Sequence, residues 1–208
     1  MNSTAKPGAH FATTFAKEMI SFAKCRTAVK NHLTGKLHQL VPVSDLSASS
    51  PQIDRIVSIC NEPRLFRTLF SDKFPDGEYP RTSADDWISC AQSGWLDGSH
   101  FVFATVDDQG LVIAVCDIKS ADIRNAEIGY WASSHHRGVM TNSVSAMLDL
   151  AKQAGFLDFF ADVLEWNDCS QRVLERVGFS LSPLAAGKPG QIQYRSEHAG
   201  VGDTREAV

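Results

Sequence analysis

The region from Glu127 to Phe179 alternates twice between a short apolar segment, a polar turn and an amphipathic segment. The first apolar segment, Glu127 to Ala132, predicts a strand. Apolar residues after Gly138 then recur at i, i+4, i+7, i+8 and i+11, which predicts a helix. The pattern repeats with a strand predicted over Phe159–Leu164 and a helix that begins near Ser170. Because strands that alternate with helices are typical of layered domains, this region predicts a sheet covered by helices.

Each polar turn in this region leads directly into a predicted helix. The first reads Ser133-Ser134-His135-His136-Arg137-Gly138-Val139-Met140-Thr141, and the second opens with Asn167-Asp168-Cys169-Ser170. The first backbone N–H groups of a helix lack partners within the helix and carry partial positive charge. A phosphate can therefore bind there, with close approach at Gly138 and added charge from His136 and Arg137. Most such turns are only connections, so the turns alone leave both interpretations open.

The remaining segments predict an α/β domain with a mixed sheet. In chain order we expect a strand at Leu40–Val43, a helix from Ser50, a loop over Phe70–Arg81, a helix from about Ser83 to Gly98, a hairpin of Phe101–Val106 and Leu111–Cys116, and a terminal hairpin of Leu181 onward with Gln191–Arg195.

Residues 1–36 differ from the rest of the chain in charge. They hold six basic residues against Glu18 alone, a local charge of +5, whereas the whole chain carries -4. Apolar residues from Phe15 to Leu33 recur at a helical spacing. We interpret residues 1–36 as a basic amphipathic helical extension, packed on the domain or on a second subunit. A transit peptide and a contact with an anionic surface are the alternatives. Residues 198–208 predict a flexible tail.

The composition argues against several classes of protein. The longest apolar runs are far shorter than the roughly 20 residues that cross a bilayer, and no secretory segment follows the N-terminus. The five cysteines are widely spaced and form no C-x-x-C pair, which disfavours a disulfide framework and a zinc site. The acidic net charge disfavours nucleic acid as a partner. We therefore expect a cytoplasmic protein without a metal or a membrane contact.

The motifs of the Glu127–Phe179 region together resemble the GNAT superfamily of acetyl-coenzyme A-dependent N-acetyltransferases. The likeness is greatest to the branch that acetylates the N-termini of ribosomal proteins. The resemblance implies a GNAT fold over residues 37–197, with a mixed, mostly antiparallel sheet that splays at the cofactor site and is flanked by helices. The segments that carry it are Glu127-Ile128-Gly129-Tyr130-Trp131, His136-Arg137-Gly138-Val139-Met140-Thr141, Asn167-Asp168-Cys169-Ser170 and Val173-Leu174-Glu175-Arg176-Val177-Gly178-Phe179.

The resemblance also implies a binding site for acetyl-coenzyme A. The family's pyrophosphate loop, Gln/Arg-x-x-Gly-x-Gly/Ala, aligns with His135 first, Gly138 fourth and Met140 sixth, so this chain departs from it at two positions. Asn167 would contact the pantetheine arm, and Ser170 would lie near the thioester sulfur. The implied cofactor-binding residues are Tyr130, Trp131, Ala132, His135, His136, Arg137, Gly138, Val139, Met140, Thr141, Asn167 and Ser170.

Two residues are candidate catalytic groups. Many family members carry a tyrosine, which protonates the leaving thiolate, where this chain has Leu174. Ser170 is the best substitute, and a helix cap that also binds coenzyme A is its alternative role. Glu127 is the candidate base for the acceptor amine, and a hydrogen-bonding carboxylate at a strand edge is its alternative role. Backbone N–H groups of the same strand would stabilise the oxyanion.

The expected reaction is direct attack of a primary amine on acetyl-coenzyme A, without a covalent enzyme intermediate. An α-amine has a pKa near 8 and a lysine side chain one near 10.4, so neutral lysine costs about 3.4 kcal/mol more. We therefore expect a protein or peptide N-terminus as acceptor, with a small amine (polyamine, aminoglycoside or amino acid) or a non-catalytic acyl-coenzyme A-binding regulatory module as alternatives. Acidic residues between Asp72 and Asp86 would either attract a cationic acceptor or form a solvated loop. A homodimer is a further option.

Overall fold

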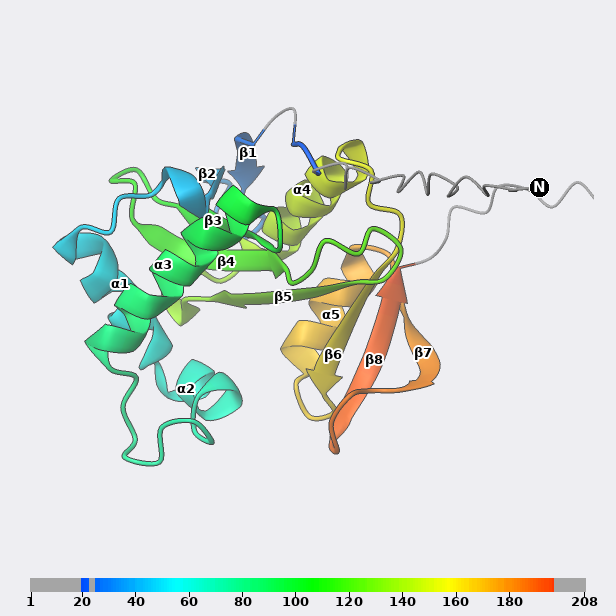
Figure 1. Cartoon of the computed structure of the whole chain (residues 1–208). Helices are drawn as coiled ribbons and strands as arrows, with labels where there is room; N and C mark the ends of the chain where they lie inside the picture. Colours follow the sequence, from blue (N-terminus) through cyan, green and yellow to red (C-terminus); the bar gives the residue numbers. More distant parts are fainter. Residues whose placement is uncertain (1–19, 23–24, 197–208) are drawn as a thin grey trace, which may run out of the picture.

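The computed structural model describes residues 20–22 and 25–196 (Figure 1). In chain order the helices and strands are β1 (Thr27–Lys30), β2 (Leu37–Pro42), η1 (Val43–Asp45), α1 (Ser50–Cys60), α2 (Pro63–Leu69), α3 (Arg81–Asp97), β3 (Phe101–Val106), β4 (Val112–Ile118), β5 (Ala126–Ala132), η2 (Ser134–His136), α4 (Met140–Gln153), β6 (Phe159–Leu164), α5 (Asp168–Arg176), β7 (Phe179–Ala185) and β8 (Gln191–Ser196).

Eight strands form one sheet in the order β1-β2-β3-β4-β5-β6-β8-β7. Neighbouring strands are antiparallel except β5 and β6, which are parallel and pair only at Ala126 with Phe159 and at Glu127 with Phe160. Beyond Glu127 the two strands separate, and β5 continues beside β4 alone (Figure 1). The expectation of a mixed, mostly antiparallel, splayed sheet is therefore confirmed.

Helices cover both faces of the sheet, α1 and α3 on one and α4 on the other (Figure 1). The side chains of β3 show why. Phe101 and Phe103 pack into the core under α4, whereas Val102 and Ala104 between them pack under α1 and α3. A strand buried on both faces reads as a continuous apolar run, because its alternate residues enter different cores. Each fully buried large side chain contributes roughly 1.5–3 kcal/mol.

The helical conformation expected for residues 1–36 is wrong over Thr27–Lys30. That segment is the edge strand β1, in which Val29 pairs with His38 of β2. Val29 is buried, but Leu33 is 65% exposed, so the apolar spacing of this segment does not mark one buried face. Residues 1–19, 23–24 and 197–208 lie outside the described residues. The division of the chain at residues 36 and 197 therefore stays a prediction.

Most other elements lie close to where the sequence predicts them, and α2 is the exception. The sequence predicts no helix at Pro63–Leu69, a seven-residue segment with no buried side chain. Helix α3 begins at Arg81, two residues before the expected start, and ends at Asp97, where Gly98 caps it with a φ of 66°. Within the described ranges, no helix has both the length and the apolar character of a membrane span.

Candidate active site

The turn from Ser133 to Thr141 has the local structure expected of an anion-binding turn. It joins the end of β5 to α4, a helix of 14 residues, through the single 3₁₀ turn η2. The first N–H groups of α4 lack partners within the helix, because the first main-chain bond inside it runs from Ser143 N to Val139 O at 3.1 Å. The turn lies at the end of β5 that has separated from β6, so an elongated anionic molecule could run from α4 along β5.

Gly138 is required by the protein's own packing. Its φ is 94°, and a Cβ atom there would lie 2.6 Å from Asn31 Oδ1 and 2.7 Å from Leu33 Cγ. Two hydrogen bonds hold the contact: Asn31 Nδ2 donates to Arg137 O at 3.0 Å, and His32 N donates to Gly138 O at 3.0 Å. The sequence suggested close approach of an anion to the backbone at Gly138. In the structure, the turn between β1 and β2 approaches Gly138 closely.

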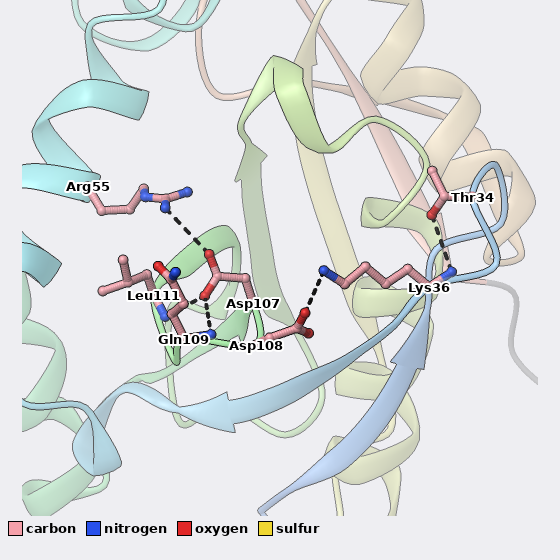
Figure 2. Close-up of polar contacts among 7 residues, drawn as sticks. All are labelled: Thr34, Lys36, Arg55, Asp107, Asp108, Gln109 and Leu111. Carbon is pink, nitrogen blue, oxygen red and sulfur yellow. Dashed lines mark hydrogen bonds and ion pairs between the residues drawn. The ribbon is translucent and has the colours of Figure 1, made fainter.

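The turn between β1 and β2 is itself tied to the turn between β3 and β4, as Figure 2 shows. Lys36 Nζ lies 2.7 Å from Asp108 Oδ2, and Arg55 of α1 lies 3.4 Å from Asp107 Oδ2. The other oxygen of Asp107 accepts the N–H groups of Gln109 and Leu111 (Figure 2). The Lys36–Asp108 pair is solvent-exposed, and such pairs contribute about 0–1 kcal/mol, so it adds little to the stability of the fold.

The surroundings of His136 disfavour the positive charge that its position suggested. Its ring lies 6.3 Å from that of the buried His38. Burial lowers the pKa of His136, and the nearby Arg55 and His38 lower it further. The Nδ1 atoms of His38 and His136 are buried without a hydrogen-bond partner among the described residues. These surroundings favour the neutral form of His136, whereas Arg137 carries a permanent charge in the turn.

Glu62 reaches the start of this turn from the N-terminus of α2. Its carboxylate accepts hydrogen bonds from Ser133 Oγ at 2.7 Å and Ser134 N at 2.6 Å, and Ser133 Oγ in turn accepts His135 N at 3.2 Å. Burial opposes ionisation of Glu62, yet these hydrogen bonds and the nearby His135 lower its pKa overall. Sequence reasoning missed Glu62, because nothing local marks a contact that spans 71 positions.

Ser170 of the second predicted turn contacts Tyr130 of β5, the strand that leads into the first turn. Tyr130 Oη lies 2.7 Å from Ser170 Oγ and donates to Ser170 O at 2.9 Å. Burial raises the pKa of Tyr130, which keeps its hydroxyl protonated. Either oxygen of the Tyr130–Ser170 pair can be the donor, so Oη can instead donate to Ser170 Oγ. The Ser170 hydroxyl can then donate to a third group, which gives two hydroxyl groups in series. Leu174, at the family's tyrosine position, is fully buried in the core.

A pocket lies on the other side of β5, between the sheet and helices α1 to α3. Its volume is about 260 Å³, and most of its wall is apolar. Trp87 and Trp131 form one part of the wall, with ring centroids 5.9 Å apart, and Phe70 and Tyr79 form another, at 4.6 Å. Tyr130 also lines this aromatic pocket. The pocket therefore borders the part of β5 that has separated from β6.

Two charged residues line the aromatic pocket: Asp117 of β4, and Lys119, which directly follows the end of β4. Asp117 pairs in register with Gly129 of β5, where an added Cβ atom would lie 2.6 Å from Asp117 Oδ1. Burial raises the pKa of Asp117 and nearby Glu127 adds to the rise, whereas Lys119, His100 and the Gly129 N–H oppose it. Sequence reasoning missed Asp117, although a carboxylate that ends a buried apolar run is a signal that could have found it.

Glu127, the predicted base, forms an ion pair with Lys119. Its side chain is 34% exposed, and it lies where β5 last pairs with β6. Gly129, two residues further along β5, lines the aromatic pocket. The Glu127 carboxylate is thus paired with the Lys119 ammonium beside the pocket.

The other sequence candidates lie apart from these groups. The acidic residues Asp72, Asp76, Glu78, Asp85 and Asp86 are all exposed, as a solvated loop and helix surface would be. Cysteines 25, 60, 90, 116 and 169 are free. The described part of the chain contains no cluster of three or more His, Cys, Asp or Glu side chains that could hold a metal.

The family model described as acetyltransferase (GNAT) domain matches residues 47–180, more than half of the chain. The protein is a GNAT acetyltransferase. Its acyl donor is acetyl-coenzyme A and its acceptor is an amine. The structure fits this co-substrate, because the N-terminus of α4 offers unpaired N–H groups to a diphosphate and the separated β5 offers backbone to an extended arm. No curated protein sequence matches the chain.

Solved structures of other GNAT acetyltransferases share the fold. RimJ from Mycobacterium smegmatis, solved with a coenzyme A disulfide, has a TM-score of 0.64 and 17% identity, over 83% of this chain and 86% of that chain. RimL, a ribosomal L7/L12 α-N-protein acetyltransferase solved with coenzyme A, has a TM-score of 0.59 and 16% identity, over 86% and 97%. The microcin C7 self-immunity acetyltransferase MccE, solved with acetyl-coenzyme A and AMP, has a TM-score of 0.61 and 15% identity, over 76% of this chain and 91% of that chain. At these identities the likeness shows the fold alone.

Proposed function

We propose that this acetyltransferase acts on the α-amine of a peptide or protein N-terminus. The observation that carries the proposal is the aromatic pocket. Its volume of about 260 Å³ lies below the roughly 300–1,000 Å³ usual for a small-molecule site, and its wall is mostly apolar. It therefore suits the first side chain of a polypeptide better than a whole aminoglycoside. Lys73 in its lining disfavours a polyamine more than a peptide N-terminus, because like charges repel and a polyamine carries several positive charges where the N-terminus carries one.

The acyl donor would bind on the opposite side of β5. In this proposal the diphosphate lies at Ser133–Thr141, and the pantetheine arm extends along Tyr130–Ala132 to Asn167. The local structures support it, since the turn ends in the N-terminus of α4 and Asn167 precedes the N-terminus of α5. The thioester would then lie near Ser170, where β5 has no partner on its β6 side within the described sheet.

The reaction would proceed by direct attack of the neutral amine on the thioester. Backbone N–H groups of β5 that point away from β4 would bind the developing oxyanion. The hydroxyl pair of Ser170 and Tyr130 would protonate the leaving thiolate. This pair replaces the family's tyrosine from a different position, which favours an active enzyme over a non-catalytic binding module.

A matched panel of acceptors tests the proposal. It contains a lysine-free peptide with a free N-terminus, the same peptide with a blocked N-terminus, a blocked peptide with one lysine, spermidine and an aminoglycoside. We expect thiol release and a mass gain of one acetyl group with the free N-terminus, at a kcat/KM at least ten-fold above the others. Equal rates on the free and blocked peptides, or a preference for a small amine, would reject the proposed acceptor.

A further inference from the structure

We propose that the Asp117 carboxylate receives the acceptor's ammonium group and takes one proton from it before the amine attacks acetyl-coenzyme A. In this proposal Glu127 holds Lys119 in place and is not the base. The inference rests on the proposed acetylation of an α-amine and names the group of the aromatic pocket that handles the amine.

The position of Asp117 in the sheet carries the proposal. In register, Asp117 lies between Val102 of β3 and Gly129 of β5, and all three residues line the aromatic pocket. Because Gly129 has no side chain, the Asp117 carboxylate can occupy the space over β5. The next residues of β5, Tyr130 and Trp131, line the same pocket. An amine at Asp117 is thus one or two residues from the part of β5 that faces the thioester.

The charges around Asp117 leave it available to a cation. Glu127 of β5 faces it, as do Lys119, just after β4, and His100, just before β3. Lys73 also lines the pocket. Glu127 and Lys119 form an ion pair with each other, so their charges largely cancel. Burial raises the pKa of Asp117, which makes its carboxylate a stronger base than an exposed one. An arriving ammonium would relieve this burial penalty.

The proton and electron balance closes without a further reactant. The ammonium gives one proton to Asp117, and the lone pair of the neutral amine forms the C–N bond at the thioester carbon. The intermediate gives one of the two protons on its nitrogen to water, re-forms the carbonyl and breaks the C–S bond, whose electron pair leaves on the thiolate. The thiolate takes a proton from Ser170 and Tyr130, which solvent restores. Asp117 returns its proton to solvent, so each turnover releases one net proton.

The walls of the pocket then define the class of acceptor. The carboxylate that would hold the ammonium lies beside a wall made of Phe70, Tyr79, Trp87 and Trp131. A large apolar side chain next to the amine would fill this space and displace water from it. The favoured acceptor is therefore an α-amine whose first residue is large and apolar, such as leucine, methionine or phenylalanine.

Three isosteric substitutions test the role of Asp117 with a free-N-terminus peptide that begins with leucine. Asp117→Asn removes the proposed base, Glu127→Gln removes the rival base, and Asp149→Asn, on an exposed position of α4, is the matched control. A positioned general base contributes typically about 10²–10⁴-fold, so we expect Asp117→Asn to lower kcat/KM at least 100-fold. Glu127→Gln should lower it less than ten-fold, and Asp149→Asn should leave it unchanged.

Further readouts separate catalysis from folding. Coenzyme A affinity and circular dichroism should match the wild type in Asp117→Asn, and Asp117→Glu should recover part of the rate. The acid limb of the pH dependence of kcat/KM should lose the contribution of the carboxylate in Asp117→Asn and keep it in Glu127→Gln. The reverse ranking of the two variants, or a lost fold in Asp117→Asn together with no recovery in Asp117→Glu, would overturn the proposal.

The same experiment distinguishes this inference from the proposed function. If the leucine peptide is acetylated but Asp117→Asn keeps the wild-type rate, Asp117 is not the base and the proposed acceptor class still stands. If only a small amine is acetylated, the proposed function fails, and the variants are compared on that amine with the same criteria. If the wild-type protein acetylates no amine in the panel, both proposals are overturned. A leucine peptide no better than its glycine counterpart would reject the apolar preference.

Discussion

Tyr130 Oη lies 2.7 Å from Ser170 Oγ, which joins a residue of β5 to one of α5. The two residues are 40 positions apart, and the contact forms beside the part of β5 that has separated from β6. The contact places the Tyr130 hydroxyl next to the Ser170 hydroxyl, which is the one expected near the thioester sulfur. The family resemblance placed Tyr130 only among the cofactor-binding residues, so the contact of its hydroxyl with Ser170 is an addition from the structure.

Removal of either hydroxyl should slow departure of the thiolate. We expect Ser170→Ala and Tyr130→Phe each to lower kcat by about 10- to 100-fold, at the lower end of acid–base effects, because water can partly replace the lost group. Thiol release at saturating acetyl-coenzyme A measures this effect. If the two hydroxyls act in series, the double variant should be little slower than Ser170→Ala alone. A fully multiplicative double variant would show instead that they act separately.

Substitution of Gly138 should destabilise the fold before it reports on phosphate binding. Gly138→Ala introduces strain at a φ of 94° and a clash with Asn31 and Leu33. We expect a loss of about 2–4 kcal/mol in unfolding free energy, of which strain alone supplies roughly 1–2. Gly110→Ala is the matched control, because its φ is 76° but no atom lies within 4 Å of the added Cβ. Equal losses in chemical denaturation would contradict the proposed clash.

Asn31 should support the Ser133–Thr141 turn from outside. Its side chain accepts Leu33 N and Thr34 N and donates to Arg137 O. We expect Asn31→Ala to lower unfolding free energy by about 1–3 kcal/mol and to weaken coenzyme A binding, because a buried acceptor and donor are lost together. Lys36→Ala, which removes an exposed ion pair of the same turn, should change both by little. Calorimetric titration of both variants decides whether the turn supports binding.

The contact of Glu62 with Ser133 and Ser134 should make stability depend on pH. The pKa of Glu62 is lowered in the folded protein, so its contribution is present above the unfolded value of about 4.5. It is lost as the pH falls through the lower folded value. We expect Glu62→Gln to lower unfolding free energy by about 1 kcal/mol at pH 7, from weakened hydrogen bonds at a partly exposed site.

The pH dependence of that difference is the decisive measurement for Glu62. The gap between wild type and Glu62→Gln should be constant from pH 7 to about pH 5 and should shrink as the pH falls below about 4.5. Urea denaturation at several pH values measures it. A gap that is the same at pH 3 and pH 7 would mean that the charge of Glu62 contributes nothing.

Local pattern was enough to predict most of the fold. The spacing of apolar residues along α4 and the apolar runs of β3 and β4 each predict their element, because burial on one or two faces imposes a period on the sequence. Gly98 ends α3 as a left-handed residue, as its position indicates. The same local approach failed at β1, whose conformation follows from its pairing with β2, and at α2, which buries no side chain and so has no apolar period.

The amino-acid sequence by itself determined the family and the two turns that begin α4 and α5, because those features depend on residues close together in the chain. Only the tertiary structure decided which side chains surround them. The Asn31–Gly138 contact, the Glu62–Ser133 hydrogen bond, the Tyr130–Ser170 pair and the position of Asp117 beside Gly129 each join different elements of the fold. Such contacts are set by strand register and helix packing, which no local periodicity encodes. For this reason the two turns could be predicted from sequence, whereas the position of Asp117 beside Gly129 could not.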